Sequence, residues 1–242
     1  MEHDVALAER LLSGSGAPTV RLYGWAPPAI SLGWNQSAEE VDEPSAAAAG
    51  IDIVRRPTGG RAILHADELT YSVIMRVTGR HVLAVYDEIS RALVTGLQRL
   101  GADVAIEKSQ PHFPSLYREA SAVACFSSSA RYEIKHHGRK LVGSAQRRYA
   151  AADGSEVVLQ HGSILLGPDH LRMVEFLRCS DAVRNRLAED LRARTTSLSE
   201  ILGRPVPFAE AADAVRTGFE TSWDIRFTGV TSTRLSSAQV VA

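Results

Sequence analysis

RRPTGGRAILHADELTYSV, residues 55–73, is the stretch that decides how this chain folds. Its paired glycines, Gly59 and Gly60, permit positive φ angles and let a ligand come close to the backbone. Arg55, Arg56 and Arg61 flank the glycines, and exposed backbone N–H groups beside arginines suit a carboxylate, an acyl carbonyl or a phosphate. The same residues also fit a hairpin turn with exposed arginines, so the spacing alone leaves two interpretations open.

Two nucleotide-binding motifs are excluded for this stretch. A Walker loop needs Gly-Lys-Ser/Thr after its glycines, and Arg61-Ala62 follows here instead. A dinucleotide fingerprint opens a helix, whereas this chain continues into strand-like residues at 62–65.

A second pattern joins a cysteine to a lysine. Cys125 precedes Lys140, with the turn-forming pair His137-Gly138 between them, so the two can lie on neighbouring strands. Only a thiolate attacks, and an ordinary thiol pKa of about 8.5 leaves most of the cysteine protonated at neutral pH. A nearby ammonium favours the thiolate. An inert buried cysteine and a solvated lysine fit the same residues.

Family resemblance separates these alternatives. The 55–73 stretch resembles the signature loop of the biotin/lipoate protein ligase and octanoyltransferase superfamily. Four further segments resemble it in the same order: PTVRLYGWAPPAISLGWNQ (18–36), ACFSSSARYEI (124–134), GRKLVGSAQRR (138–148) and VVLQHGSILL (157–166). Within the superfamily the chain is most similar to cysteine-dependent octanoyltransferases of lipoate biosynthesis, which have a cysteine at the position of Cys125. ATP-using ligases typically have a third glycine in place of Arg61 and lack that cysteine.

The resemblance implies both a fold and an activity. The expected fold is α+β, with a mixed, largely antiparallel sheet flanked by helices, as in biotin/lipoate protein ligase catalytic domains. The expected enzyme moves an octanoyl group from acyl carrier protein, through a Cys125 thioester, to a lysine of a lipoyl-carrier protein. The acceptor is either the glycine-cleavage H protein or a lipoyl domain, and this is the first step of endogenous protein lipoylation. No ATP, cofactor or metal is expected.

The resemblance also assigns residue roles. Cys125 is the expected nucleophile, and Lys140 lowers the pKa of its thiol or shuttles a proton. Backbone N–H groups of residues 58–61 are candidate donors to the oxyanion. The expected substrate-binding residues are Arg55, Arg56, Thr58, Gly59, Gly60, Arg61, His65, Gly143, Ser144, His161 and Gly162. A structural histidine is an equal alternative at His65. Cys179 is expected to be a buried apolar residue of an amphipathic helix.

Three alternatives remain open. An ATP-dependent lipoate or biotin ligase would use the same loop and Lys140 to hold an acyl-adenylate, with Cys125 incidental. An amidotransferase would move octanoyl or lipoyl groups between carrier proteins and would also need a cysteine. A non-catalytic acyl-binding module is least favoured, because a binder needs neither Cys125 nor Lys140.

Composition is compatible with these expectations. The chain has 242 residues, 45% of them hydrophobic and 23% charged, with a net charge of −1. This length suits one domain, and the charge disfavours nucleic-acid binding. No apolar run approaches the ~18 residues of a membrane span, and the acidic start MEHDVALAERL does not resemble a secretory signal. Two cysteines fit a reducing cytoplasm, and a monomer is expected.

Periodicity predicts helices and many strands in succession. Helices are expected at 3–12, 37–49, 81–100, after Pro168 and at 206–223; Ser197-x-x-Glu200 is a possible capping box. Strands are expected at 19–23, 29–32, 51–54, 61–65, 69–76, 102–107, 121–126, 131–136, 139–146 and 156–165. We expect one catalytic domain over residues 1–242, with a core of about 18–203 and a helical segment of about 204–242.

Overall fold

A computed structural model describes residues 1–107, 133–228, 232–235 and 238–241. Cys125 and the strand predicted at 121–126 lie outside the described residues.

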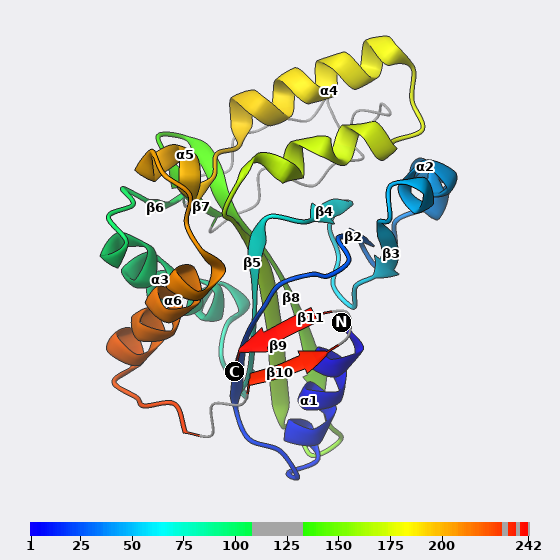
Figure 1. The fold of residues 1–242 in the computed structure, drawn as a ribbon. Coiled ribbons are helices and arrows are strands. Elements are labelled where there is room, and N and C mark those ends of the chain that lie inside the picture. The colour runs from blue at the N-terminus through cyan, green and yellow to red at the C-terminus, as the bar shows by residue number, and fades with distance from the viewer. Residues whose placement is uncertain (108–132, 229–231, 236–237, 242) are drawn as a thin grey trace.

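The centre of the described structure is an eight-stranded sheet (Figure 1). Its spatial order is β10 (Ser232–Leu235), β11 (Ala238–Val241), β1 (Thr19–Tyr23), β5 (Glu68–Arg76), β9 (Glu156–Leu165), β8 (Arg139–Ala150), β7 (Glu133–His136) and β6 (Ala105–Glu107). Neighbouring strands are antiparallel throughout. The long pairing of β5 with β9 runs from Glu68↔Leu165 to Arg76↔Val157. This register fixes where the motif residues of β8 and β9 lie relative to β5.

A second, three-stranded sheet carries the glycine stretch. β2 (Ala29–Leu32) lies in its middle, parallel to β3 (Asp52–Arg55) and antiparallel to β4 (Ile63–His65). β3 and β4 therefore pair with β2 and not with each other. The hairpin-turn interpretation of residues 55–61 is wrong for this reason, and the parallel pair makes the strand arrangement mixed, as expected.

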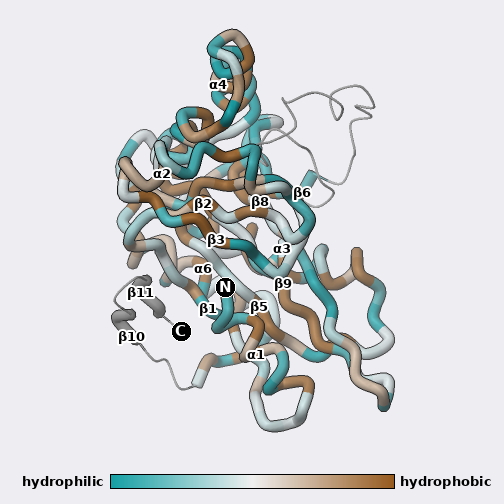
Figure 2. The backbone as a smooth tube through the Cα atoms, turned by 90° about the vertical axis from the view of Figure 1, so that its right-hand side faces the viewer, coloured by the Kyte–Doolittle hydropathy of each residue, from teal (hydrophilic) through white to brown (hydrophobic). Residues whose placement is uncertain are grey.

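Helices cover the large sheet. α3 (Val82–Arg99) packs against α6 (Phe208–Trp223) on one side of it, and α1 (Glu2–Leu12) packs against β5 and β9 (Figure 1). α4 (Asp181–Arg194) lies at one end of the molecule and α1 toward the other in both views (Figures 1 and 2). The four-residue repeat predicted for α3 is confirmed, because Val85, Ile89, Leu93 and Leu97 are all fully buried. None of the helices in the described ranges is long and apolar enough to cross a membrane.

Several predicted elements differ from the structure. The helix expected at 37–49 is two short helices, η1 (Ala38–Glu40) and α2 (Glu43–Ala48). Ser37 is the N-cap of η1. Asp42 is the N-cap of α2, and its side chain accepts a hydrogen bond from the Ser45 N–H at 3.3 Å. A new cap followed by a proline in the first turn is typical of a helix start, so the segment divides there.

The C-terminal region also departs from expectation. η5 (Pro168–Phe176) is a 3₁₀ helix, and Cys179 follows it in a bend before α4, half-buried against the core and not on a helix. α5 (Leu198–Leu202) begins at Ser197, which accepts from the Glu200 N–H at 3.3 Å, so this half of the capping box is confirmed. The helical prediction for 204–242 is wrong beyond Trp223, where β10 and β11 follow and extend the sheet at β1.

Candidate active site

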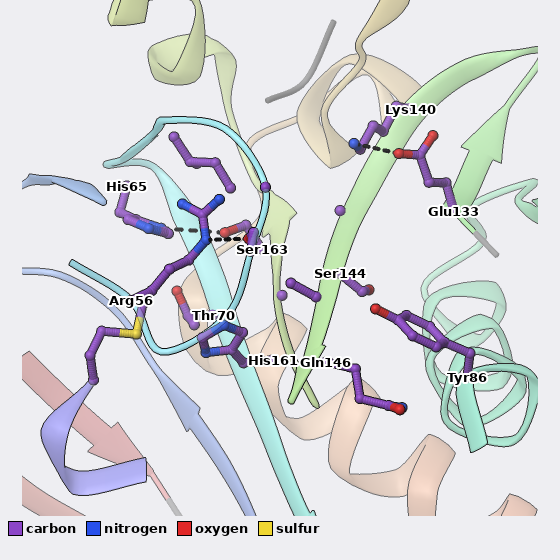
Figure 3. Close-up of a pocket in the computed structure, with 17 residues that line it drawn as sticks. Arg56, His65, Thr70, Tyr86, Glu133, Lys140, Ser144, Gln146, His161 and Ser163 are labelled. Atoms are coloured by element: carbon purple, nitrogen blue, oxygen red, sulfur yellow. Dashed lines mark hydrogen bonds and ion pairs between the residues drawn. The ribbon is translucent and has the colours of Figure 1, made fainter. Parts of the chain in front are cut away.

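A cavity of about 290 Å³ lies where the glycine stretch of the small sheet faces β8 and β9 of the large one (Figure 3). This volume is close to the lower end of the usual range for ligand pockets. The predicted site residues in its wall are Arg56, Gly59, Gly60, His65, Lys140, Gly143, Ser144, His161 and Gly162. Arg55, Thr58 and Arg61 are not among the residues that line it, within the part of the chain described.

Close backbone contact shapes the glycine stretch. A Cβ atom on Gly33 would lie 1.9 Å from the carbonyl oxygen of Gly60, so only glycine fits at position 33. Gly60 has a φ angle of +99°, a conformation that side chains disfavour. The Trp34 N–H donates to the Thr58 carbonyl oxygen at 2.9 Å. These contacts fasten the loop to the end of β2.

The two arginines at the start of this stretch bind backbone carbonyls. Arg56 is only 3% exposed and donates to the carbonyl oxygens of Ser31, Gly59 and Arg61 at 2.9, 3.1 and 2.6 Å. Arg55 donates from Nη1 to the carbonyl oxygens of Gly33, Trp34 and Gln36. The exposed-arginine interpretation is therefore wrong for Arg56. Through these hydrogen bonds, both side chains hold the loop in its conformation.

His65 belongs to a buried polar network beside the cavity. Its Nδ1 lies 2.8 Å from Glu68 Oε1, and its Nε2 lies 2.7 Å from Ser31 Oγ. The Trp25 ring stacks on the imidazole at a centroid distance of 4.4 Å. Since both ring nitrogens have partners and the ring is stacked, this geometry favours a structural role for His65.

His161 is buried on the cavity wall as a neutral imidazole. Burial lowers the pKa of His161 to about 4, although the Asp4 carboxylate opposes this shift. His161 Nε2 lies 2.6 Å from Thr58 Oγ1. Thr58 therefore contacts His161 and does not itself line the cavity. His161 Nδ1 has no hydrogen-bond partner among the described residues. This nitrogen is buried, so the imidazole contributes to the wall as a neutral ring.

Ser144 is oriented by a buried tyrosine. The Tyr71 hydroxyl donates to Ser144 Oγ at 2.7 Å and accepts from Gln160 Nε2 at 3.2 Å. Burial raises the pKa of Tyr71 to about 12, against the effect of these hydrogen bonds, so the phenol keeps its proton at neutral pH. Ser144 is thereby held in place at the wall of the cavity.

Lys140 forms a buried ion pair. Its Nζ lies 2.5 Å from Glu133 Oε1, and the two side chains are 6% and 3% exposed. Oε1 accepts no well-aligned hydrogen bond among the described residues, so the contact is an ion pair. Figure 3 shows this pair across the cavity from Arg56 and His65. The alternative of a solvated Lys140 is wrong, because its side chain is buried.

Sequence reasoning missed several cavity residues. They are Met1, Ile63, Thr70, Tyr86, Glu133, Ala145, Gln146 and Ser163. The position of Glu133 emerges only from the strand pairing in the structure, where Lys135 lies opposite Lys140 and strand alternation places Glu133 on the same face as Lys135. No signal existed for Tyr86, which comes from α3 and reaches the cavity only through tertiary packing.

A group able to hold a cation lies outside the cavity lining. Asp103, His136 and His137 bring ligand atoms within 4.8 Å of one another near the β7–β8 turn. His136 Nδ1 also lies 2.6 Å from the Asp103 carbonyl oxygen. The cavity itself has no comparable group among its described residues.

The chain is similar to known proteins over most of its length. Residues 1–220 match the family model described as the lipoyl protein ligase A/B catalytic domain. The octanoyltransferase LipM of Symbiobacterium thermophilum is 42% identical over 232 residues, which cover 94% of this chain and 83% of that protein. The octanoyltransferase LipM of Bacillus subtilis is 37% identical over 218 residues, which cover 86% of this chain and 76% of that protein.

Solved structures agree on the fold. The bipartite lipoate protein ligase of Thermoplasma acidophilum superposes with a TM-score of 0.72 at 21% identity, covering 96% of this chain and 83% of that one. Lipoate-protein ligase A, solved with ATP, superposes with a TM-score of 0.66 at 20% identity, covering 95% and 83%. The expected α+β fold is confirmed. From its sequence matches, the chain belongs to the lipoyl protein ligase A/B catalytic-domain family and, within that family, to the LipM octanoyltransferases.

Proposed function

We propose that this protein transfers an octanoyl group from acyl carrier protein to a lysine of a lipoyl-carrier protein, through a thioester on Cys125. The observation that carries the proposal is the match to LipM octanoyltransferases over 94% of the chain. The small cavity with buried Lys140 in its wall supports it.

The proposed reaction has two balanced steps. The Cys125 thiolate attacks the carbonyl carbon of the octanoyl thioester, and the phosphopantetheine thiolate leaves and takes up a proton. The neutral amine of the acceptor lysine then attacks the Cys125 thioester, forming an amide and losing one proton as the thiolate leaves. The second step runs downhill, because an amide is more stable than a thioester, so no ATP is consumed.

We propose the following roles for the predicted site residues. The Lys140 ammonium favours the thiolate that attacks and the thiolates that leave. Gly59 and Gly60 leave room for the acyl chain, while Arg55 and Arg56 hold the loop around it. Ser144 offers a polar contact to the carbonyl or the pantetheine arm, and the buried His161 shapes the wall beside it. We also propose that the protein acts as a monomer in a reducing cytoplasm, where the thiol stays available.

An assay with purified partners tests this function. Octanoyl-acyl carrier protein and an apo lipoyl domain are mixed with the enzyme without ATP, and the lipoyl domain is weighed by mass spectrometry. We expect one octanoyl group per lipoyl domain. Octanoate with ATP and Mg²⁺ should give no product, whereas product only under those conditions would identify a ligase.

A second arm separates transferase from amidotransferase. Octanoyl-H protein replaces octanoyl-acyl carrier protein as the donor, with the same acceptor. A faster reaction from the H protein than from acyl carrier protein would contradict the proposed donor.

A further inference from the structure

Glu133 is the only carboxylate among the described residues that line the cavity. Its side chain is 3% exposed and reaches the wall from β7, the strand next to Lys140. The cavity also contains Arg56, whose guanidinium binds backbone carbonyls on the opposite side (Figure 3). Glu133 and Lys140 thus form a separate charged unit within the wall.

Strand pairing brings these two side chains together. β7 and β8 are antiparallel, with Lys135 opposite Lys140 and Ile134 opposite Val142. The register shifts between Ile134 and Lys135, where the pairing of the two strands is irregular. Glu133 then lies diagonally across from Lys140, and its Oε1 is 2.5 Å from Nζ. Glu133 Oε2 is 3.9 Å from Lys135 Nζ, a second and weaker ionic contact.

The burial of the Glu133–Lys140 pair determines its effect on the charge of Lys140. An isolated ammonium in a cavity wall loses its hydration, and a paired carboxylate offsets much of that cost. Lysine also has four rotatable carbon–carbon bonds and is free to move its charge unless a partner holds it. A group that stabilises thiolates must keep its charge in one place, since electrostatic stabilisation depends on preorganised geometry.

We propose that Glu133 is a positioning residue, which holds the Lys140 ammonium at the cavity wall for octanoyl transfer. This inference rests on the proposed function and deepens it. Glu133 acts through Lys140 and makes no contact with the acyl group. Its loss therefore lowers the turnover rate more than it weakens substrate binding.

The central test is a double-mutant cycle in the transfer assay. Glu133→Gln keeps the size of the side chain and removes its charge. In the wild-type background we expect kcat to fall on the order of 100-fold, the loss typical of a misplaced catalytic group, with little change in KM. In the Lys140→Met background, Glu133→Gln should cause no further loss, because the group it positions is absent. An equal loss in both backgrounds would contradict the proposal, as would a wild-type kcat for Glu133→Gln alone.

Two further variants separate positioning from folding. Glu133→Asp keeps the charge, and we expect it to recover part of the rate lost in Glu133→Gln; if it turns over no faster than Glu133→Gln, the carboxylate does not position Lys140. Glu156→Gln is the matched control: it breaks an ion pair with Arg148 (3.5 Å) elsewhere in the same sheet, and it should transfer at the wild-type rate. Circular dichroism and thermal melts confirm that each variant is folded. If Glu133→Gln does not fold, Glu133→Met, which also removes the charge at similar side-chain length, takes its place in the cycle, and a wild-type kcat for folded Glu133→Met overturns the proposal.

Failure of this inference is distinguishable from failure of the proposed function. The cycle is measured relative to wild-type transfer from octanoyl-acyl carrier protein. An inactive wild type would contradict the function itself, whereas an active wild type with an insensitive Glu133 would contradict only the positioning role.

Discussion

Two glycines of the cavity wall show how single atoms decide what fits there. A Cβ atom on Gly59 would meet no atom of the described residues within 4 Å, and the φ angle of Gly59 is not positive. A Cβ atom on Gly162 would lie 2.3 Å from the Gly143 carbonyl oxygen and 2.7 Å from Tyr71 Cε1. Gly162 is therefore required by the contact between β8 and β9. The described residues place no such constraint on Gly59, which lines the cavity.

Gly59→Val should block octanoyl transfer while the protein remains folded. The added side chain meets none of the described protein atoms at the cavity wall, so we expect it to compete with the acyl chain. We expect the acylation rate to fall at least tenfold, with Gly59→Ala in between, and a melting temperature close to that of wild type. Transfer at the wild-type rate by folded Gly59→Val would place the acyl chain elsewhere.

His161 makes stability depend on pH. Its pKa is about 4 in the folded protein, because burial disfavours the charged ring, and about 6.5 when unfolded. Both states are neutral above pH 6.5. As the pH falls from 6.5 toward 4, the unfolded state takes up the proton first, so stability is lost over this window by about 3 kcal/mol at most.

His161→Gln should reduce this acid sensitivity. Glutamine keeps a polar group near Thr58 and does not titrate. Urea unfolding at pH 7.5 and pH 4.5 should show a smaller loss of unfolding free energy for the variant than for wild type. Equal losses in the two proteins would mean that His161 is protonated in the folded state or solvated.

At the scale of elements, one buried carboxylate attaches α1 to the sheet. Asp4 forms an ion pair with Arg21 of β1 and accepts hydrogen bonds from Tyr23 at 3.1 Å and Ser72 at 2.8 Å. Burial alone would raise the pKa of Asp4, but the Arg21 guanidinium holds it below its ordinary value. The Asp4 carboxylate therefore stays charged at neutral pH. Its contacts hold α1 against the sheet, and Met1, which precedes α1, lines the cavity.

Asp4→Ala should destabilise the protein by about 3–5 kcal/mol, because it leaves the buried Arg21 charge without its partner. Asp213→Ala is the control: Asp213 pairs with Arg216 on the exposed side of α6, and such pairs contribute less than about 1 kcal/mol. Chemical denaturation of both variants measures the difference. Similar losses for the two would mean that the Asp4 network does not anchor α1.

The helices and strands show which parts of the fold the sequence patterns could predict. The strands at 19–23, 29–32 and 156–165 are confirmed with their bounds, and α3 is confirmed by its buried four-residue repeat. Such patterns depend on local alternation of apolar residues. The pairing of β2 with both β3 and β4 depends on contacts distant in the chain, so periodicity could not predict it.

At the scale of the whole molecule, the cavity lies between the two sheets, and both contribute residues to its wall. The small sheet supplies the glycine stretch with Arg56 and His65, and the large sheet supplies Lys140, Ser144 and His161. The resemblance of the motifs to the family predicted that these residues share one site. The prediction succeeds because each motif lies on an element that faces the cavity. Their individual directions were not predictable: Arg56 points inward to carbonyls, and Glu133 pairs with Lys140. These directions follow from loop closure and strand register, which a single sequence does not encode locally.

The central claim is that Cys125 carries the octanoyl group, and intact-mass spectrometry tests it most directly. The protein is mixed with octanoyl-acyl carrier protein without ATP or acceptor, and then weighed. We predict one octanoyl adduct on wild type and on Cys179→Ala, and none on Cys125→Ala. An adduct that persists in folded Cys125→Ala, or an acylated acceptor formed by that variant at the wild-type rate, would contradict the account.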